Sequence, residues 1–380
     1  MLQTYLLLTI ATDNVQCNSM DNQRISSIRK IFTTQSIDAL FISNYYNILY
    51  VTSFKTLTTD EREAFVLVTK KNIYLFTDAR YVYTDSGVIL KLIEPGKGLF
   101  FHLGTIIKEE KIDTLGIESE DLRVHEYEKL KSVFNPSKII PLEKTIIKLR
   151  AIKENDEVKK IEKACEIIDQ CLENIIPSIM IGDSEKKIAF QIERWIKEHG
   201  FDLAFDPIVA VDANSAIPHY DTKEGNGIVK SSSIILIDFG VKYQNYMSDI
   251  TRMVFVKPTD EMINNYKKLL ETQEQTIERT GKETDPKIID SLCRENLEEK
   301  QLPNFSHSLG HGVGLEIHEY PKLSQMSDDT IVNNHVFTVE PGVYFPNKWG
   351  MRIEDTIVVK NGKAEVLTMY TKEPIIINTS

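Results

Sequence analysis

Short apolar runs alternate with amphipathic stretches along the first part of the chain, from Asn22 onward. Runs rich in β-branched and aromatic residues are typical of strands, and the amphipathic stretches are typical of helices. The strand candidates are IDALFIS, AFVLVT, NIYLFTD, VILKLIE and DTLGIES, and the helix candidates are RISSIRKIF and HEYEKLKSVF. This alternation predicts a small α/β domain over residues 21–146.

The pattern changes at Leu149–Ile176, where apolar residues recur at steps of three and four within a strongly charged segment. Almost no helix breaker interrupts this segment before Pro177, so it predicts one long helix and a second domain over residues 147–380. A further helix is expected at Ser184–His199 and two more between Asp260 and Lys300, with strands grouped before and after that pair. Strands and helices in separate runs indicate an α+β fold rather than a doubly wound sheet.

The composition is that of an ordinary globular protein, with 42% hydrophobic and 27% charged residues among 380. A net charge of −11 argues against nucleic acid or an anionic membrane surface as a partner, because a basic patch would supply most of that affinity. The apolar run Tyr5–Ala11 is too short to span a bilayer and lacks the basic residues of a signal peptide, so Met20 is a candidate native start. The four cysteines form no CxxC pair, which favours reduced thiols and a cytoplasmic protein.

Two aspartates, Asp238 and Asp249, stand at the inner ends of two strongly apolar runs. An antiparallel hairpin that turns between Tyr243 and Gln244 would set these side chains opposite each other on one face, with Cβ atoms about 4.5–5.5 Å apart. Facing carboxylates repel unless a proton or a cation lies between them. A single Asp more often caps a loop, but two on such apolar strands favour a bound metal.

The C-terminal block repeats this arrangement with Glu340 and Glu354, on two strand candidates whose midpoint is Asn347. A connection with an odd number of residues needs a bulge or a longer loop to keep the pair aligned. The chain thus offers two pairs of carboxylates on two predicted hairpins.

The segment HSLGHGVGLEIHE, His307–Glu319, lies between these hairpins and holds three of the eight histidines. Its glycines disfavour a helix, and apolar residues alternate from His311 to His318, so we predict a glycine-bent strand that approaches a bound group closely. His311 is the candidate metal ligand. His199 is expected to cap a helix end, and a structural role is likewise expected for His102, His125 and His335.

One imidazole beside four carboxylates makes a set of five ligands, whose four negative charges balance two divalent cations. Oxygen-rich sites with a single nitrogen suit Mn²⁺, Co²⁺ or Fe²⁺ at least as well as Zn²⁺. A pair of such ions about 3.5–4 Å apart activates a shared water for hydrolysis. We therefore expect two divalent ions per chain, with Mn²⁺ as the first candidate.

Five ordered segments resemble the signature of a known family, the pita-bread metallopeptidases, and within it the Xaa-Pro group of aminopeptidase P and prolidase. They are NSAIPHY, IDFGVKYQNYMSDITR, HSLGHGVGLEIHE, TVEPGVY and RIEDT. Upstream, LFTDARY is similar to the creatinase-like N-terminal domain, and LRAIKENDEVKKIEKA to the first helix of the catalytic domain. The resemblance extends from about Asp21 over nearly the whole chain. It implies a smaller creatinase-like α/β domain followed by a pita-bread catalytic domain with pseudo-twofold symmetry.

The resemblance also implies how the five ligands share the metals. Asp238 and Asp249 would bind the first ion, with Asp249 as a bridge. Glu354 would bridge as well, while His311 and Glu340 complete the second ion.

Four further residues match positions that support catalysis in this family. His219, in IPHY, and His318 match histidines that contact the substrate and its tetrahedral intermediate. His307 and Arg352 match supporting positions at the rim and behind the metals, and Glu340 is the expected proton shuttle to the leaving proline nitrogen. Before NSA this chain reads AVDANSA where many relatives carry a glycine, so we expect the approach to His219 to differ in shape.

The expected activity is hydrolysis of the bond between an N-terminal residue and a following proline in short peptides, in the manner of aminopeptidase P. The alternative is an Xaa-Pro dipeptidase (prolidase), because the loops that set substrate length cannot be read from the sequence. A remoter alternative is a non-catalytic pita-bread binding module, although such modules typically lack some of the ligands. Metal-free creatinase is disfavoured by the five ligands, and methionine aminopeptidase by the extra N-terminal domain. A homodimer is also expected.

Overall fold

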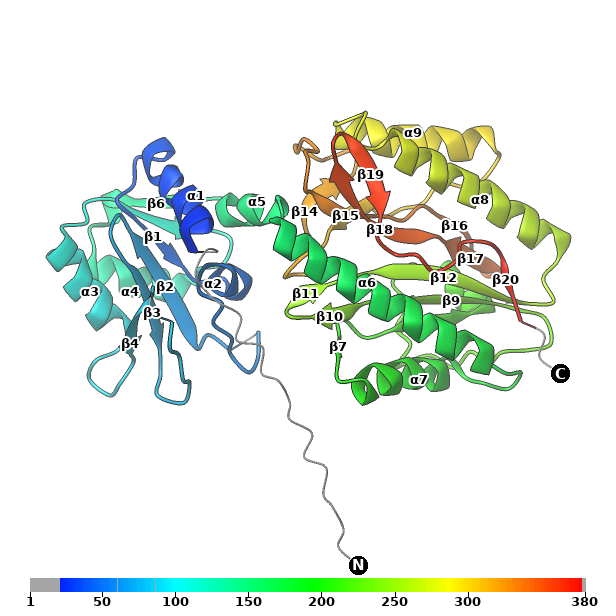
Figure 1. Cartoon of the computed structure of the whole chain (residues 1–380), viewed down its shortest axis with the longest axis horizontal. Helices are drawn as coiled ribbons and strands as arrows, with labels where there is room; N and C mark the ends of the chain where they lie inside the picture. Colours follow the sequence, from blue (N-terminus) through cyan, green and yellow to red (C-terminus); the bar gives the residue numbers. More distant parts are fainter. Residues whose placement is uncertain (1–20, 60, 86, 378–380) are drawn as a thin grey trace, which may run out of the picture. The chain divides into compact units, whose positions relative to one another are not determined.

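The chain folds into two compact units that divide after Thr145 (Figure 1). The computed structural model describes residues 21–59, 61–85 and 87–377. The run Tyr5–Ala11 and the candidate start at Met20 lie outside the described residues. None of the helices in the described part of the chain combines the length and apolar character that a membrane crossing requires.

A mixed sheet with the strand order β4-β3-β2-β1-β5-β6 forms the N-terminal unit. Strands β1, β5 and β6 are parallel to one another, and β2 is antiparallel to β1. The alternation of strands and helices confirms the predicted α/β class. The described strands are β1 (Ala39–Ile42), β2 (Ala64–Thr69), β3 (Ile73–Thr77), β4 (Ile89–Leu92), β5 (Leu115–Glu118) and β6 (Ile139–Leu142); the helices are α1 (Asp21–Thr34), α2 (Tyr45–Thr52), α3 (Leu99–Glu110), α4 (Val124–Val133) and the 3-10 turn η1 (Pro136–Lys138).

The sequence pattern does not predict α2, α3 or β6. Helix α2, YYNILYVT, is buried along most of its length and apolar on nearly every side, so it lacks the 3.6-residue periodicity of a surface helix. Its start is fixed by Asn44, whose side chain accepts a hydrogen bond from the Asn47 N–H.

A larger sheet organises the C-terminal unit, with the order β14-β13-β15-β18-β12-β9-β8, β19 beside β18 and β20 beside β12. Two small sheets, β11-β10-β7 and β16-β17, extend it. The described strands are β7 (Asp202–Leu203), β8 (Ile208–Val211), β9 (Ser233–Phe239), β10 (Val241–Tyr243), β11 (Tyr246–Met247), β12 (Ile250–Val256), β13 (Gly310–Gly312), β14 (Glu319–Leu323), β15 (Val336–Val339), β16 (Gly342–Phe345), β17 (Trp349–Arg352), β18 (Glu354–Lys360), β19 (Lys363–Val366) and β20 (Ile375–Ile376). The helices are α5 (Thr145–Ala151), α6 (Asn155–Ile175), α7 (Glu185–Glu198), α8 (Asp260–Arg279) and α9 (Pro286–Glu299), with 3-10 turns η2 (Ile176–Ser178) and η3 (Asp212–Ala216).

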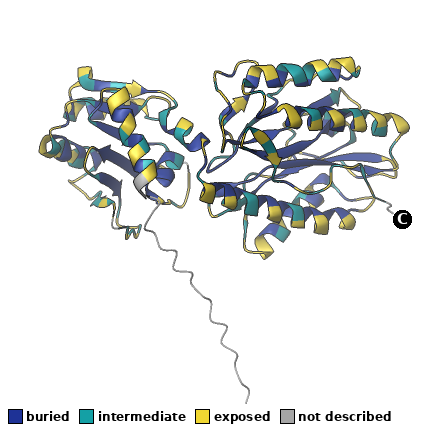
Figure 2. Cartoon of the chain, turned by 45° about the horizontal axis from the view of Figure 1, so that its top comes forward, coloured by how far each residue is buried: buried dark blue, intermediate teal, exposed yellow. Residues whose placement is uncertain are grey.

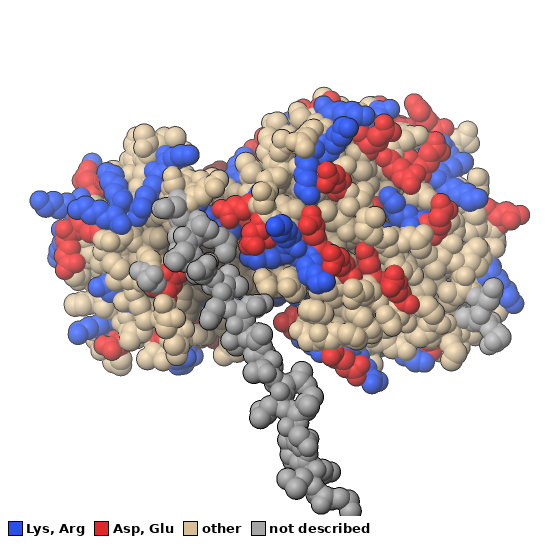
Figure 3. Space-filling model, in the orientation of Figure 1, with Lys and Arg blue, Asp and Glu red and all other residues tan. Residues whose placement is uncertain are grey.

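Helices cover both faces of this sheet, and its strands are buried while the outer helix faces are exposed (Figures 1 and 2). Side chains alternate between the faces along each strand. On β9, Ile235 and Ile237 pack in the core with α6 and α7, whereas Ile234 and Leu236 pack in the core with α8 and α9. The helices expected at Ser184–His199 and between Asp260 and Lys300 are confirmed, and so is the α+β class. Figure 3 shows acidic and basic side chains interspersed over one surface of this unit.

The predicted single helix at Leu149–Ile176 is wrong, because residues 152–154 separate α5 from α6. The backbone N–H of Lys153 donates to the Asn334 carbonyl at 2.9 Å, which takes it out of a helical hydrogen bond. Glu154 then starts α6 through a capping box with Glu157. Tertiary pairing therefore outweighs a continuous helical pattern here.

The hairpin of β9 and β12 turns one residue later than predicted. Gln244 and Asn245 both have positive φ, of 47° and 74°, as a two-residue turn that matches strand twist requires. The strands consequently pair Asp238 with Thr251, so Asp238 and Asp249 are not directly opposite. A shift of two positions keeps both aspartates on the same face.

The second hairpin keeps the predicted register. Val339 pairs with Asp355 and Gly342 with Arg352, so Glu340 and Glu354 fall opposite each other. A three-residue loop connects β16 to β17, and Asn347 at its centre has a φ of 61°. This loop is the longer connection that an odd number of residues needs to keep the pair aligned.

The predicted strand over His311–His318 is only partly correct, because β13 ends at Gly312 and the following residues are irregular. Two glycines allow a very close backbone approach on either side of His311. A Cβ on Gly310 would lie 1.9 Å from the Thr338 carbonyl oxygen, and one on Gly312 would lie 2.1 Å from that of Tyr320. The pairing of β13 with β14 also shifts between His311 and Gly312, which ends the regular strand.

Candidate metal centre

A cavity of about 520 Å³ lies within the C-terminal unit. All nine residues singled out from the sequence line it: Asp238, Asp249, His311, Glu340, Glu354, His219, His318, His307 and Arg352. The rest of the wall is formed by Ile147, Phe205, Ile208, Pro218, Ser308, Glu319, Tyr320 and Lys322. The fold thus gathers residues from both hairpins and from the histidine segment around one space.

Asp238 and Asp249 extend two apolar rows of the sheet. By strand alternation, Asp238 shares a face with Leu236, and Asp249 shares a face with Thr251 and Met253. Leu236 and Met253 belong to the core under α8 and α9. The hydrophobic layer therefore ends in carboxylates at the cavity.

The ligand candidates converge on a small volume. The Nε2 atom of His311 lies 3.6 Å from an oxygen of Asp249 and 3.5 Å from an oxygen of Glu340. Ligand atoms of Asp249, His311 and Glu354 all lie within 4.8 Å of one another. The Oδ1 atoms of Asp238 and Asp249 are buried and have no hydrogen-bond partner among the described residues. Buried acceptors without a donor fit a bound cation.

Burial raises the pKa of all four carboxyl groups. In Asp249 the charges of the other three carboxylates add to this effect, and its pKa rises well above the usual range. Without a cation, protons on these groups are therefore lost only at a higher pH than protons on exposed carboxyls. A divalent cation would take the place of those protons.

Arg352 is a permanent positive charge against this cluster. Its Nη2 atom donates to Asp238 at 2.5 Å and its Nε atom to the Thr251 hydroxyl at 3.0 Å. The Thr251 hydroxyl in turn donates to Glu354 at 2.6 Å. Arg352 therefore fixes one carboxylate directly and a second through Thr251.

The imidazoles are held in the neutral form that binds metals. Burial lowers the pKa of His311 to about 3 and that of His307 to about 4. The Nδ1 atom of His311 lies 3.2 Å from the Gly312 carbonyl oxygen, which favours a proton on Nδ1 and leaves Nε2 free to bind. The ring of His318 lies 4.3 Å from that of His311, edge to face, and His307 Nε2 lies 2.9 Å from the Tyr344 hydroxyl.

The structure adds residues to the site that the sequence pattern does not single out. Thr251 and Tyr344 both contact Arg352, and Thr251 could have been noticed because it lies on β12, two residues beyond Asp249. Lys322 lines the cavity four residues after His318. Only the three-dimensional arrangement identifies it, because a single lysine carries no motif.

The loop that carries His219 begins at Asp212, within the segment AVDANSA. Asp212 has a φ of 52°, in the left-handed region that glycine adopts without strain. Its side chain accepts hydrogen bonds from the Ile234 N–H at 3.2 Å and from Lys230 at 3.0 Å. Aspartate therefore takes up a backbone conformation that glycine favours, and its carboxylate adds hydrogen bonds that glycine could not make. The different shape expected before His219 stays a prediction.

Substitution of Asp212 separates these two effects. Asp212→Ala is expected to lower the free energy of unfolding by about 2 kcal/mol, because it keeps the strained backbone and leaves the buried Ile234 N–H unpaired. Asp212→Gly should cost about 1 kcal/mol less, since glycine relieves the strain. Urea denaturation measures both, with Asp206→Ala as an exposed control. Equal losses for Ala and Gly would show that the backbone conformation carries no strain.

Comparisons with known proteins agree with this geometry. The chain matches the Creatinase/Prolidase N-terminal domain over residues 24–152 and Metallopeptidase family M24 over residues 159–361. It is 32% identical over 360 residues to the Xaa-Pro dipeptidase of Pyrococcus horikoshii, covering 93% of this chain and 99% of that protein. Two similar solved structures are an Xaa-Pro dipeptidase from Bacillus anthracis, with a TM-score of 0.85, 32% identity and coverage of 93% and 99%, and an X-Pro aminopeptidase from Thermotoga maritima, with a TM-score of 0.82, 32% identity and coverage of 93% and 100%. The chain therefore belongs to metallopeptidase family M24 and combines a creatinase/prolidase N-terminal domain with a pita-bread catalytic domain.

Proposed function

We propose that this metallopeptidase is an Xaa-Pro dipeptidase that uses two divalent cations. The sequence alone favoured the aminopeptidase P type, but the similarity to dipeptidases in both sequence and structure supports the alternative better. An X-Pro aminopeptidase is equally identical, so the substrate length has to be argued from the cavity itself.

The observation that carries the proposal is the position of Lys322. It is exposed, it lines the cavity, and its ammonium group has no ion-pair partner among the described residues. The positive charge of Lys322 also acts on His318. Partial burial is the largest cause of the lowered pKa of His318, and the charges of His219 and Lys322 add to it. In an Xaa-Pro dipeptide the carboxylate sits on the proline ring, two bonds from the scissile nitrogen. A free cation beside the catalytic histidines suits that carboxylate, whereas a longer peptide presents a neutral amide there.

The apolar part of the wall suits the proline ring. Phe205, Ile208 and Pro218 line the same cavity as Lys322. The peptide bond before proline is a tertiary amide without an N–H, and its ring hinders the extended binding that most peptidases use. An apolar wall and a separate cation can therefore hold the two ends of the proline independently.

The five ligands proposed from the sequence would hold the two cations, with Mn²⁺ as the first candidate: Asp238, Asp249, His311, Glu340 and Glu354. Such ions supply Lewis acidity and lower the pKa of a water. Glu340 is proposed to take the proton of that water and pass it to the proline nitrogen, because a secondary amine leaves poorly unless it is protonated.

The histidines and Arg352 complete the proposed mechanism. His318 and His219 would donate hydrogen bonds to the oxyanion that develops on the scissile carbonyl. His307, bonded to Tyr344, would support the rim. Arg352 would keep Asp238 ionised and in place through its 2.5 Å contact.

Replacement of Lys322 tests the substrate length. Lys322→Met is expected to raise KM for Ala-Pro about 10- to 100-fold, the value of a hydrogen bond to a charged group, with a smaller change in kcat. The matched control Lys322→Arg keeps the charge and should stay close to wild type. Steady-state kinetics with Ala-Pro, Ala-Pro-amide and Ala-Pro-Gly measures the effect.

The wild-type enzyme should strongly prefer Ala-Pro, and Lys322→Met should lose that preference over the amide. Cleavage of Ala-Pro-Gly at least as fast as Ala-Pro, together with an unchanged KM in Lys322→Met, would favour an aminopeptidase instead.

A further inference from the structure

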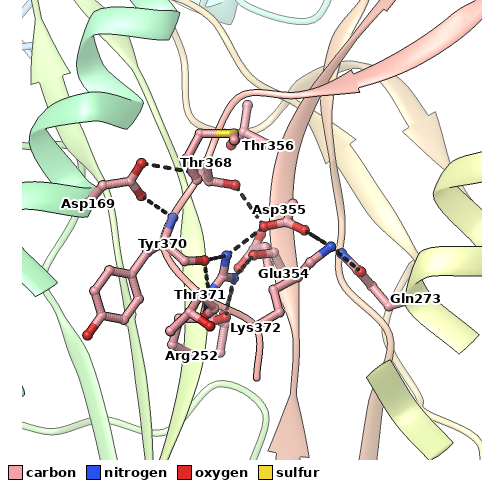
Figure 4. Close-up of polar contacts among 12 residues, drawn as sticks. Asp169, Arg252, Gln273, Glu354, Asp355, Thr356, Thr368, Tyr370, Thr371 and Lys372 are labelled. Carbon is pink, nitrogen blue, oxygen red and sulfur yellow. Dashed lines mark hydrogen bonds and ion pairs between the residues drawn. The ribbon is translucent and has the colours of Figure 1, made fainter. Parts of the chain in front are cut away.

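Figure 4 shows a second polar cluster, around Asp355, the residue that follows the candidate ligand Glu354. Asp355 follows Glu354 on β18, and successive side chains of a strand point to opposite faces, so Glu354 lines the cavity while Asp355 does not. The Asp355 side chain is fully buried. It accepts hydrogen bonds from four groups: Arg252 at 2.7 Å, Thr368 at 2.8 Å, Gln273 at 2.8 Å and Lys372 at 2.9 Å.

Arg252 is the centre of this Asp355 cluster and is also fully buried. Its Nη1 atom donates to the Thr251 carbonyl at 3.0 Å and to the Glu354 carbonyl at 2.6 Å. The remaining donors reach Asp355 and the carbonyls of Tyr370 and Thr371 (Figure 4). All five N–H groups of the guanidinium thus have acceptors, which is the condition for burying this charge at low cost.

The cluster also anchors the segment 368–372, which connects β19 and β20. Asp169 on α6 accepts hydrogen bonds from the Met369 and Tyr370 N–H groups, at 2.8 and 3.0 Å. Lys372 contacts both Asp355 and Gln273 of α8. A stretch far along the chain is therefore tied to the strand that carries Glu354.

The need for such a cluster follows from the sheet itself. Strands β9 and β12 pair over seven residue pairs and β15 and β18 over four, but β12 and β18 pair only at Ile250 with Asp355 and Thr251 with Glu354. One hairpin of ligands lies on each side of this short contact. The backbone ladder alone therefore gives little control over the distance between Asp249 and Glu354.

We propose that Arg252, Asp355 and Lys372 are positioning residues that set the metal affinity of the site. Arg252 clamps the backbone of Thr251 and Glu354, the two residues whose side chains share a 2.6 Å hydrogen bond beside the cavity. Asp355 and Lys372 hold the guanidinium from behind and balance its charge. The inference rests on the proposed metal site and extends it to a segment that does not touch the cavity.

The test is a titration of metal-stripped protein with Mn²⁺ by calorimetry, together with the thermal midpoint of each metal-free variant. Asp355→Asn and Lys372→Met are expected to weaken Mn²⁺ binding about 10- to 100-fold, as loss of groups that orient metal ligands does. Lys372→Met removes a partly exposed side chain, so it remains informative if Asp355→Asn fails to fold. Lys360→Met is the matched control, because Lys360 lies on β18 and pairs with Glu162 and Glu365 instead. It should bind Mn²⁺ like wild type.

A merely structural role would lower the metal-free midpoint and leave the Mn²⁺ affinity unchanged, and that result would overturn the inference. Failure of the proposed function looks different: wild type would bind no Mn²⁺, which overturns the metal site and the inference with it. If wild type instead binds Mn²⁺ but leaves Ala-Pro intact, the substrate proposal fails, while the affinity ratios still decide the role of the Asp355 cluster.

Discussion

Asp249→Asn is expected to reduce kcat/KM for Ala-Pro by on the order of a thousandfold or more, because the proposed metal ligands act together and loss of one disables the whole set. Ligand atoms of Asp249 lie close to those of His311 and Glu354, and one Asp249 oxygen has no hydrogen-bond partner among the described residues. An amide is a poorer ligand, and its NH₂ group would turn toward the neighbouring carboxylates. The fold should survive, because the raised pKa of Asp249 makes a neutral side chain acceptable there without metal.

Metal content by mass spectrometry and circular dichroism would accompany the kinetics of this variant. Asp183→Asn is a matched control, since Asp183 is buried but bonds Lys187 and the Met180 N–H away from the cavity. It should cost stability and keep activity. An Asp249→Asn protein that binds metal fully and turns over at the wild-type rate would contradict the ligand assignment.

Removal of metal is expected to lower the thermal midpoint of the C-terminal unit by about 10 °C. A ligand at a thousand times its Kd stabilises by about 4 kcal/mol, and a domain of this size shifts by about 2–4 °C per kcal/mol. The loss arises because, without the metal, Arg352 alone cannot balance four buried carboxyl groups whose pKa values are already raised by burial.

The size of this effect should depend on pH. Burial raises the pKa of Glu354 from 4.5 to about 8, so the folded, metal-free chain binds protons more tightly than the unfolded chain. The contribution of Glu354 to the stability of the metal-free protein is therefore fully present below about pH 4.5 and is lost as the pH rises through about 8. Metal binding requires ionised carboxylates and strengthens over the same range. The gap between loaded and stripped protein should widen with pH.

Differential scanning calorimetry at pH 6 and pH 8, with EDTA or with excess Mn²⁺, measures this gap. A midpoint that EDTA leaves unchanged at both values would argue against a metal centre in this cavity.

The sequence pattern identifies the faces of the strands better than their partners. Alternation places Asp238 and Asp249 on one face both in the predicted register and in the observed one. The two registers differ by two residues, and a shift of two leaves each side chain on the same face. The position of the turn decides which of the two registers forms. That position depends on the positive φ of Gln244 and Asn245, which the hydrophobic pattern does not encode. In the second hairpin Asn347 lies at the centre of the loop, and there the simple midpoint gives the correct register.

Features that depend on distant neighbours escaped prediction. The break before α6 is set by Asn334, which pairs with Lys153 from far along the chain. The role proposed for Lys322 depends on the cavity that it shares with His318, and the role proposed for Arg252 depends on the short pairing of β12 with β18. None of these carries a local motif, whereas the ligand candidates do, since carboxylates on apolar strands are conspicuous in a one-dimensional pattern.

The last described strand, β20, has a consequence for how this protein could fail. Ile375 and Ile376 run parallel to Val254 and Phe255 of β12, beyond the point where β18 departs. These two residues thus cover a hydrogen-bonding edge of β12, which lies inside the sheet between β18 and β9. Removal of β20 would expose that edge to pairing with strands of other molecules. We therefore expect such a truncation to cause aggregation before it causes loss of activity.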